Sequence, residues 1–95
     1  MLIRIVKMEF KKEYISDFKI LFNQAYPEII KFDGCMSVQL MKDPENEFVY
    51  FTYSKWENES SLENYRNSEF FLATWRKTKI LFSEKAIAFS MIDGN

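Results

Sequence analysis

Four segments of this chain have the character of β-strands with apolar side chains on both faces, and this pattern limits the folds available to it. The segments are Leu2–Phe10, Cys35–Lys42, Glu47–Trp56 and Lys85–Ile92. Successive side chains on a strand point to opposite faces, so a strand with one solvated face alternates apolar and polar residues. Because none of the segments alternates cleanly, we expect a sheet that is covered on both faces.

The segment between the first two strands predicts a helix. From about Lys12 to Phe32 one apolar stripe recurs at helical spacing and can lie on a sheet, through Tyr14, Phe18, Leu21, Phe22, Ala25 and Ile29. Pro27 lacks a backbone donor and crowds the preceding turn, so we expect a kink or a restart near Tyr26. Gly34 suits the left-handed conformation that often ends a helix.

The second half of the chain predicts a hairpin followed by a divided helical region. A turn over residues 43–46 (DPEN) joins the second and third strands. After the third strand, Asn58 or Ser60 can cap a helix, and Ser60 begins a capping-box pattern. Asn67 and Ser68 offer a second cap, after which apolar residues recur at helical intervals as far as Phe82.

The resulting order, β-α-β-β-α-β with the second helical region split, is typical of a ferredoxin-like α+β fold with a four-stranded antiparallel sheet. We expect one such domain over residues 1–95, because 95 residues leave little interior for a second. The helical connections can shield only one face of the sheet. Because the other face is also apolar, we expect a homodimer formed face to face through the sheet, a dimeric α+β barrel.

Composition and charge argue against several other classes of protein. The net charge is −1 and the charged residues are interleaved, so no basic face for nucleic acid is expected. Arg4 and Lys7 interrupt the apolar N-terminal segment, unlike a signal peptide, and no uncharged apolar run approaches the ~18 residues of a membrane span. The single cysteine, Cys35, suits a reducing compartment. We therefore expect a cytoplasmic protein that binds neither nucleic acid nor membranes.

No residue pattern by itself names a reaction. The chain has no histidine, so it lacks the commonest metal ligand and the usual general base, and its carboxylates show no metal-site spacing. Cys35 has no histidine to activate it and is better interpreted as a buried strand residue. Lys7 is either a solvated strand residue or, if desolvated, a base. Trp56 either closes a core or stacks on a ligand.

Three motifs resemble the antibiotic biosynthesis monooxygenase family. They are FDGC at residues 32–35 before the second strand, YSKWE at 53–57 closing the third, and YRNSEFF at 65–71 across the helical break. The resemblance covers essentially the whole chain and implies a dimeric α+β barrel. It also implies an active cavity in each protomer, between the sheet and the helices, while the other face of the sheet forms the dimer.

The resemblance further implies a monooxygenase that acts without metal, flavin or other cofactor on an aromatic, quinol-like or polyketide-like molecule. In such enzymes an electron-rich anion of the substrate reacts with oxygen, and the protein supplies a dry pocket and handles protons. Carried onto this chain, it implies catalytic roles for Tyr65 and Trp75. The substrate-binding residues implied are Lys7, Tyr53, Trp56, Arg66 and Phe71.

The chain also departs from part of this family. Heme-degrading members carry an asparagine, a tryptophan and an iron-ligating histidine at positions that align with Lys7, Tyr65 and Trp75, so heme degradation is not expected here. These departures favour an alternative hypothesis, a non-catalytic dimeric module that binds a small apolar ligand, because a fold does not determine a function. A third alternative is an interaction domain with no open cavity.

Overall fold

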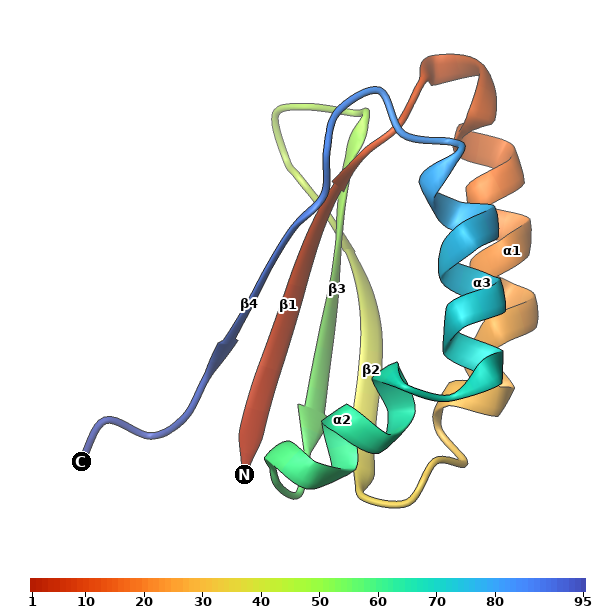
Figure 1. Ribbon diagram of the computed structural model, residues 1–95. Helices are drawn as coiled ribbons and strands as arrows, with labels where there is room; N and C mark the ends of the chain where they lie inside the picture. The colour runs from red at the N-terminus through yellow and green to blue at the C-terminus, as the bar shows by residue number, and fades with distance from the viewer.

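The computed structural model describes residues 1–95 and consists of one four-stranded antiparallel sheet with three α-helices on one side of it (Figure 1). The sheet has the order β2-β3-β1-β4, with strands β1 (Leu2–Glu9), β2 (Cys35–Lys42), β3 (Val49–Trp56) and β4 (Ile87–Met91). The helices are α1 (Ile15–Ile29), which follows a short 3₁₀ turn, α2 (Glu59–Arg66) and α3 (Glu69–Lys79). The predicted ferredoxin-like α+β fold with a divided second helical region is confirmed.

Strand β1 lies inside the sheet, where it pairs antiparallel with β3 and with the edge strand β4. Arg4 is the register partner of both Ser54 and Ser90, and the next residue, Ile5, is the partner of Tyr53 and Phe89. Residues paired across an antiparallel ladder project from the same face. The two rows of partners therefore lie on opposite faces of the sheet.

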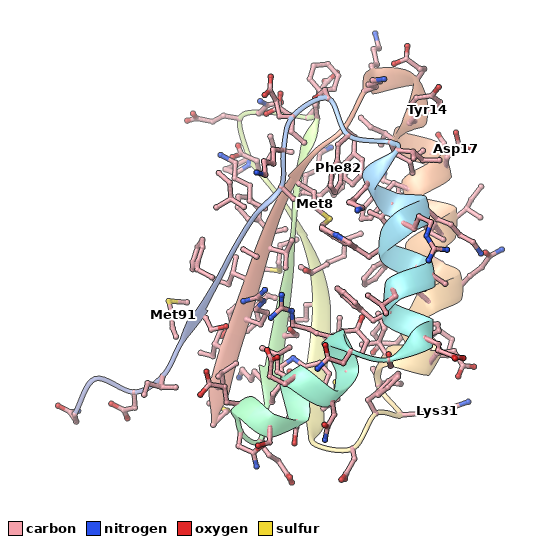
Figure 2. All side chains as sticks on the ribbon, in the orientation of Figure 1. Met8, Tyr14, Asp17, Lys31, Phe82 and Met91 are labelled. Atoms are coloured by element: carbon pink, nitrogen blue, oxygen red, sulfur yellow. The ribbon has the colours of Figure 1, made fainter.

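The inner face, which the helices cover, carries a hydrophobic cluster at each end of β1. At one end Phe10 is only 1% exposed, and its ring lies 4.1 Å from that of Phe18 between centroids. Figure 2 shows Met8 and Phe82 in the space between the sheet and the helices at this end. The cluster at the other end contains Leu2, Trp56 and Leu62. Burial of these side chains is the main favourable contribution to folding.

Helix α1 differs from the prediction at Pro27, whereas Gly34 after the helix has the predicted left-handed conformation. The helix is unbroken from Ile15 to Ile29 with Pro27 inside it, so the restart expected near Tyr26 is wrong. Pro27 lies in the last turn and removes only the one bond that a backbone N–H would donate to the Asn23 carbonyl, and the helix ends two residues later. Gly34 has a positive φ of 83°, as expected, and a side chain there would also overlap Ser61.

The caps of the two shorter helices define the break between them. Asn58 caps α2, since its Oδ1 accepts the Ser61 N–H at 2.9 Å, whereas Ser60 lies inside the helix and the capping-box prediction is wrong. Ser68 caps α3: its Oγ accepts the Phe71 N–H at 3.1 Å and donates to the Tyr65 carbonyl at 2.6 Å. These bonds hold the end of α2 and the start of α3 together.

The last helix ends earlier than predicted, and the last strand begins two residues later than predicted. Helix α3 ends at Lys79, so Phe82 lies beyond the helix that was expected to include it. Phe82 instead forms an isolated bridge with Phe10, and its ring is 5.4 Å from the ring of Phe10 between centroids. The aromatic packing at this end of the sheet, rather than helix propensity, places Phe82.

The outer face of the sheet is apolar and no helix covers it. It carries a set of aliphatic and aromatic side chains from all four strands: Ile3, Ile5, Met41, Phe51, Tyr53, Ile87, Phe89 and Met91. Ile87 is 56% exposed, and Figure 2 shows Met91 projecting away from the helices. None of the helices combines the length and apolar character needed to cross a membrane.

Candidate functional site

A cavity of about 510 Å³ lies between the inner face of the sheet and the helices. Its floor is formed by β1 and β3, and all three helices contribute to its walls. Fifteen of its 23 lining residues are hydrophobic, which suits a small and mainly apolar molecule. The cavity lies between the two hydrophobic clusters at the ends of β1, where the inner-face residues are Arg4 and Val6.

Four aromatic residues expected at the site line this cavity and form one continuous row. Trp56 stacks on Tyr65 with 5.1 Å between ring centroids, and Phe71 meets Tyr65 edge to face at 5.0 Å. Phe71 then stacks on Trp75 at 6.0 Å, with the ring planes only 11° apart. Phe71 thus connects the rings of α2 and α3 across the helical break.

Trp56 takes part in both the core and the cavity wall. Its side chain is 1% exposed and belongs to the hydrophobic cluster with Leu2 and Leu62, yet it also lines the cavity. The indole Nε1–H donates to Ser54 Oγ at 3.0 Å, and Ser54 Oγ donates to the Arg4 carbonyl at 3.4 Å. Because its one polar group is satisfied within the sheet, Trp56 offers a ligand an aromatic surface and no free hydrogen-bond donor.

Tyr65 has a phenol that stays protonated at neutral pH. Burial raises the pKa of Tyr65 well above its ordinary value, and the neighbouring Cys35 raises it further. A protonated phenol can donate a hydrogen bond to a ligand oxygen but cannot serve as a general base. Burial also raises the pKa of the Cys35 thiol, which makes it less nucleophilic, as the interpretation of Cys35 as a strand packing residue requires.

Charged groups gather at one side of the cavity, around Arg4. The Arg4 Nη1 donates to Ser90 Oγ at 3.1 Å, and Arg66 forms an ion pair with Glu63 at 3.0 Å. Arg4, Glu63 and Arg66 all line the cavity. Burial lowers the pKa of Arg4, the positive charge of Arg66 lowers it further, and Glu63 partly offsets these effects. The site therefore contains two guanidinium groups and one carboxylate.

Arg4 was not among the site residues predicted from the sequence, although its position on the strand was informative. Arg4 shares a strand face with Val6 and Met8, so strand alternation predicted that a charged group projects among apolar ones. An arginine on the face that helices cover is unusual, because burial of an unpaired charge costs free energy. The alternation places Arg4 and Lys7 on opposite faces of the strand, and the assembled sheet then determines which face the helices cover.

Two of the predicted substrate-binding residues, Lys7 and Tyr53, do not line the cavity. Lys7 pairs with Phe51 and Tyr53 with Ile5, so both lie on the outer face of the sheet. Side chains alternate along a strand, and Tyr53 is an odd number of residues from Trp56, so these two residues cannot share a face. The structure therefore places Lys7 and Tyr53 away from this cavity, and their role in substrate binding stays a prediction.

The structure offers no ready site for a metal ion. Nowhere do three or more His, Cys, Asp or Glu side chains come close enough together to hold one. The groups available to a ligand are thus the row of rings, the protonated phenol of Tyr65 and the charges around Arg4. This arrangement can bind a planar organic molecule by stacking and can hold an oxygen atom of that molecule by hydrogen bonds.

The sequence also matches a family model. Residues 1–77 match the model described as antibiotic biosynthesis monooxygenase. The chain belongs to this family. The match spans β1 through most of α3, the part of the chain that supplies nearly all of the cavity lining, and it confirms the resemblance found in the three sequence motifs. A comparison with curated proteins finds no significant match.

Solved structures of similar shape support the same assignment of fold. A crystal structure of an antibiotic biosynthesis monooxygenase superposes with a TM-score of 0.92 at 16% identity, over 100% of both chains. A conserved protein from Methanosarcina mazei Go1 has a TM-score of 0.90 at 22% identity, over 96% of this chain and 91% of its own. Rv0793 from Mycobacterium tuberculosis has a TM-score of 0.90 at 14% identity, over 99% and 95%. At these identities the likeness establishes the fold of the family member and not its substrate.

Proposed function

We propose that this family member is a small monooxygenase that oxidises an aromatic, quinol-like or polyketide-like molecule in the cavity without a cofactor. The observation that carries the proposal is the continuous row of rings from Trp56 to Trp75 along the wall of a mainly apolar cavity. A planar substrate can stack on such a row, and its dimensions suit a cavity of about 510 Å³. Membership in the family supports the reaction type.

In the proposed reaction the substrate supplies all the electrons. An electron-rich anion of the substrate reacts with O2, one oxygen atom is incorporated into the substrate, and the other leaves as water. The substrate loses two hydrogen atoms and gains one oxygen atom, so no further reductant is required. The protein contributes a cavity from which the bound substrate displaces water, where charged groups act more strongly than they do in solution.

Tyr65 and Trp75 are the proposed catalytic residues because both line the cavity. Since the pKa of Tyr65 is raised, its role is to donate a hydrogen bond to a substrate oxygen rather than to transfer or remove a proton. Trp75, whose ring is nearly parallel to that of Phe71, orients the plane of the substrate. Trp56 and Phe71 complete the stacking surface, and Arg66 adds a guanidinium at its edge.

Oxygen uptake with a panel of hydroquinones and anthrone-type compounds tests the proposal. We expect turnover by the native protein and a loss of ~100-fold or more in Tyr65→Phe, the scale of a lost hydrogen-bond donor to a developing oxyanion. The same substitution on the other face, Tyr53→Phe, is the matched control and should leave the rate unchanged. Added catalase separates incorporation of oxygen from release of peroxide. Absence of uptake with every compound would contradict the proposal. So would rates in Tyr65→Phe and Trp75→Phe that equal the rate of the native protein.

A second candidate function is a non-catalytic module that binds a small apolar ligand. It is favoured by the chemistry of the lining, which has no histidine and whose tyrosine is held protonated. Mass spectrometry of the protein purified under native conditions distinguishes the two functions. A ligand that copurifies and is recovered unchanged after incubation in air supports the binding module, whereas recovery of an oxygenated product supports the enzyme.

The same proposal includes a homodimer formed through the outer face of the sheet. The support is the exposed apolar surface of all four strands on that face, which a two-fold copy would cover. The cavity lies on the opposite face, so dimerisation and ligand binding do not compete for surface. We further propose that residues 1–95 form one domain that acts in the cytoplasm, a reducing compartment that suits the single half-buried Cys35.

A further inference from the structure

Arg4 is a cation on the inner face of the sheet that has no anionic partner in the chain. The ion pairs of the structure are Lys31 with Glu28 and Arg66 with Glu63, and neither includes Arg4. Its one side-chain hydrogen bond, from Nη1, is to the neutral hydroxyl of Ser90 at 3.1 Å. A guanidinium carries five N–H donors, so most of its donor capacity is unused by the protein.

The neighbouring charges do not neutralise Arg4. Two guanidinium groups line the cavity, and Glu63 is the only carboxylate of the lining. Arg66 forms an ion pair with Glu63 at 3.0 Å, so no carboxylate is left to pair with Arg4. The lining therefore carries one net positive charge, at Arg4. A partly buried charge without a partner is unfavourable, and an anion that pairs with it recovers part of the lost solvation. Arginine also pairs with a carboxylate through two parallel hydrogen bonds, which gives the contact a defined geometry.

The rest of the lining defines the body of such a ligand. Fifteen of the 23 lining residues are hydrophobic, and the row of rings from Trp56 to Trp75 offers a flat aromatic surface. An inorganic anion would leave this surface without a partner, and a neutral hydrocarbon would leave Arg4 without one. A ligand that satisfies both must combine a planar apolar body with a single oxyanion.

We propose that the cavity selects planar aromatic molecules that carry one carboxylate or comparable oxyanion, and that Arg4 is the residue that binds this group. Ser90 on the edge strand β4 acts as a positioning residue, because its hydroxyl holds one nitrogen of the guanidinium and leaves the other two for the ligand. The inference rests on the proposed function of the cavity. It adds the charge of the ligand and names Arg4 as the residue that binds the charged group.

Isothermal titration calorimetry with 2-naphthoate and 2-naphthamide tests the inference, because the two compounds have the same shape and differ in charge. The native protein should bind the carboxylate at least ~10-fold more tightly, the scale of a charge-assisted hydrogen bond converted to affinity. Arg4→Met keeps the apolar stem and should remove this preference while leaving amide binding intact. Arg4→Lys should restore part of it. Ser90→Ala should weaken carboxylate binding several-fold and leave the amide unaffected.

Arg76→Met is the matched control, because Arg76 is exposed on α3 and does not line the cavity. It should retain the full preference for the carboxylate. Equal binding of the carboxylate and the amide by the native protein would overturn the inference and leave the proposed function standing. Failure to bind either compound would overturn the inference, whereas oxygen uptake tests the proposed function separately. The comparison of two ligands on the native protein holds even if a variant does not fold.

Discussion

Both faces of the sheet carry apolar side chains, but the chain covers only one of them. On the inner face the chain's own helices bury rings such as Phe10, which is 1% exposed, and enclose a cavity. On the outer face the chain covers nothing, and Phe89 remains 46% exposed. The helices of this small domain therefore cover only one face of the sheet, and the other face is the one through which a homodimer is proposed.

The faces also differ in where their polar groups lie. The inner face brings Arg4, Ser54 and Ser90 together as register partners. Hydrogen bonds connect Arg4 to Ser90 and Ser54 to Arg4, and Ser54 also accepts the indole N–H of Trp56. The outer face at the same level carries Ile5, Tyr53 and Phe89. A polar strip beside an aromatic row can recognise a ligand, whereas an exposed and mainly apolar sheet face suits a large complementary surface.

The largest expected effect comes from removing the Phe10 ring from the hydrophobic cluster that it forms with Phe18 on the inner face. Phe10→Ala should reduce the free energy of unfolding by about 3–5 kcal/mol, because it deletes a fully buried ring that packs on Phe18, Tyr50 and Phe82. Guanidinium unfolding measures the change. Phe89→Ala is the matched substitution on the outer face, and in dilute protein it should cost under about 1 kcal/mol. Equal losses would break the distinction between the two faces.

The next effect concerns association through the outer face. Phe89→Lys places a charge on the surface proposed to be the dimer interface, and two-fold symmetry introduces it twice. The dissociation constant of the dimer should rise by about 100-fold, which corresponds to roughly 2.7 kcal/mol. Sedimentation velocity across a range of concentrations measures this change. Lys77→Ala on the outer side of α3 should not alter it. A native protein that is monomeric at every concentration would remove the proposed role of this face.

A smaller effect should follow from breaking the polar strip of the inner face. Ser54→Ala leaves the indole N–H of the buried Trp56 without its acceptor, which should cost about 1–3 kcal/mol of stability. Ser37→Ala makes the same chemical change on β2, where no side-chain bond depends on the hydroxyl, and should cost under about 0.5 kcal/mol. Urea unfolding compares them, and equal costs would show that the Trp56 contact contributes little.

The smallest effect is that of ionising the Tyr65 phenol on stability. It is absent at neutral pH and appears only in alkaline solution. The folded state raises the pKa of Tyr65, so its stabilising contribution is fully present below the unfolded value of about 10 and is lost as the pH rises above it. Unfolding of the native protein and of Tyr65→Phe, measured at about pH 7 and pH 11, tests this. The difference in stability between the two should shift in favour of the variant at the higher pH, and a constant difference would contradict the shift.

Much of the fold was predictable because the local signals agree with one another. The β2 strand was predicted with the bounds that the structure shows, Cys35–Lys42, and Ser68 was predicted as the cap that divides the second helical region. Pro27 was misjudged because its effect depends on its distance from the end of the helix, which the sequence does not state. Local propensity therefore determined the elements better than it determined their ends.

The candidate site was predicted in part. Trp56, Tyr65, Arg66, Phe71 and Trp75 all line the cavity, because the family motifs mark the helical break and the end of the third strand. Lys7 and Tyr53 were predicted to bind substrate, but the structure places them on the outer face, away from this cavity. Arg4, which lines the cavity, was not predicted. Which of two apolar faces receives the helices is a property of the assembled sheet, so no single strand could reveal it.

By itself the sequence determined the order of strands and helices, the family, and the presence of apolar side chains on both sides of the sheet, since these follow from periodicity and from motifs local in the chain. Only the tertiary structure decided that Phe71 joins the rings of two helices, and that Arg4 lies in the cavity beside an ion pair that does not include it. The physical reason is that these relations depend on how the helices dock on the sheet, which brings together residues distant in sequence.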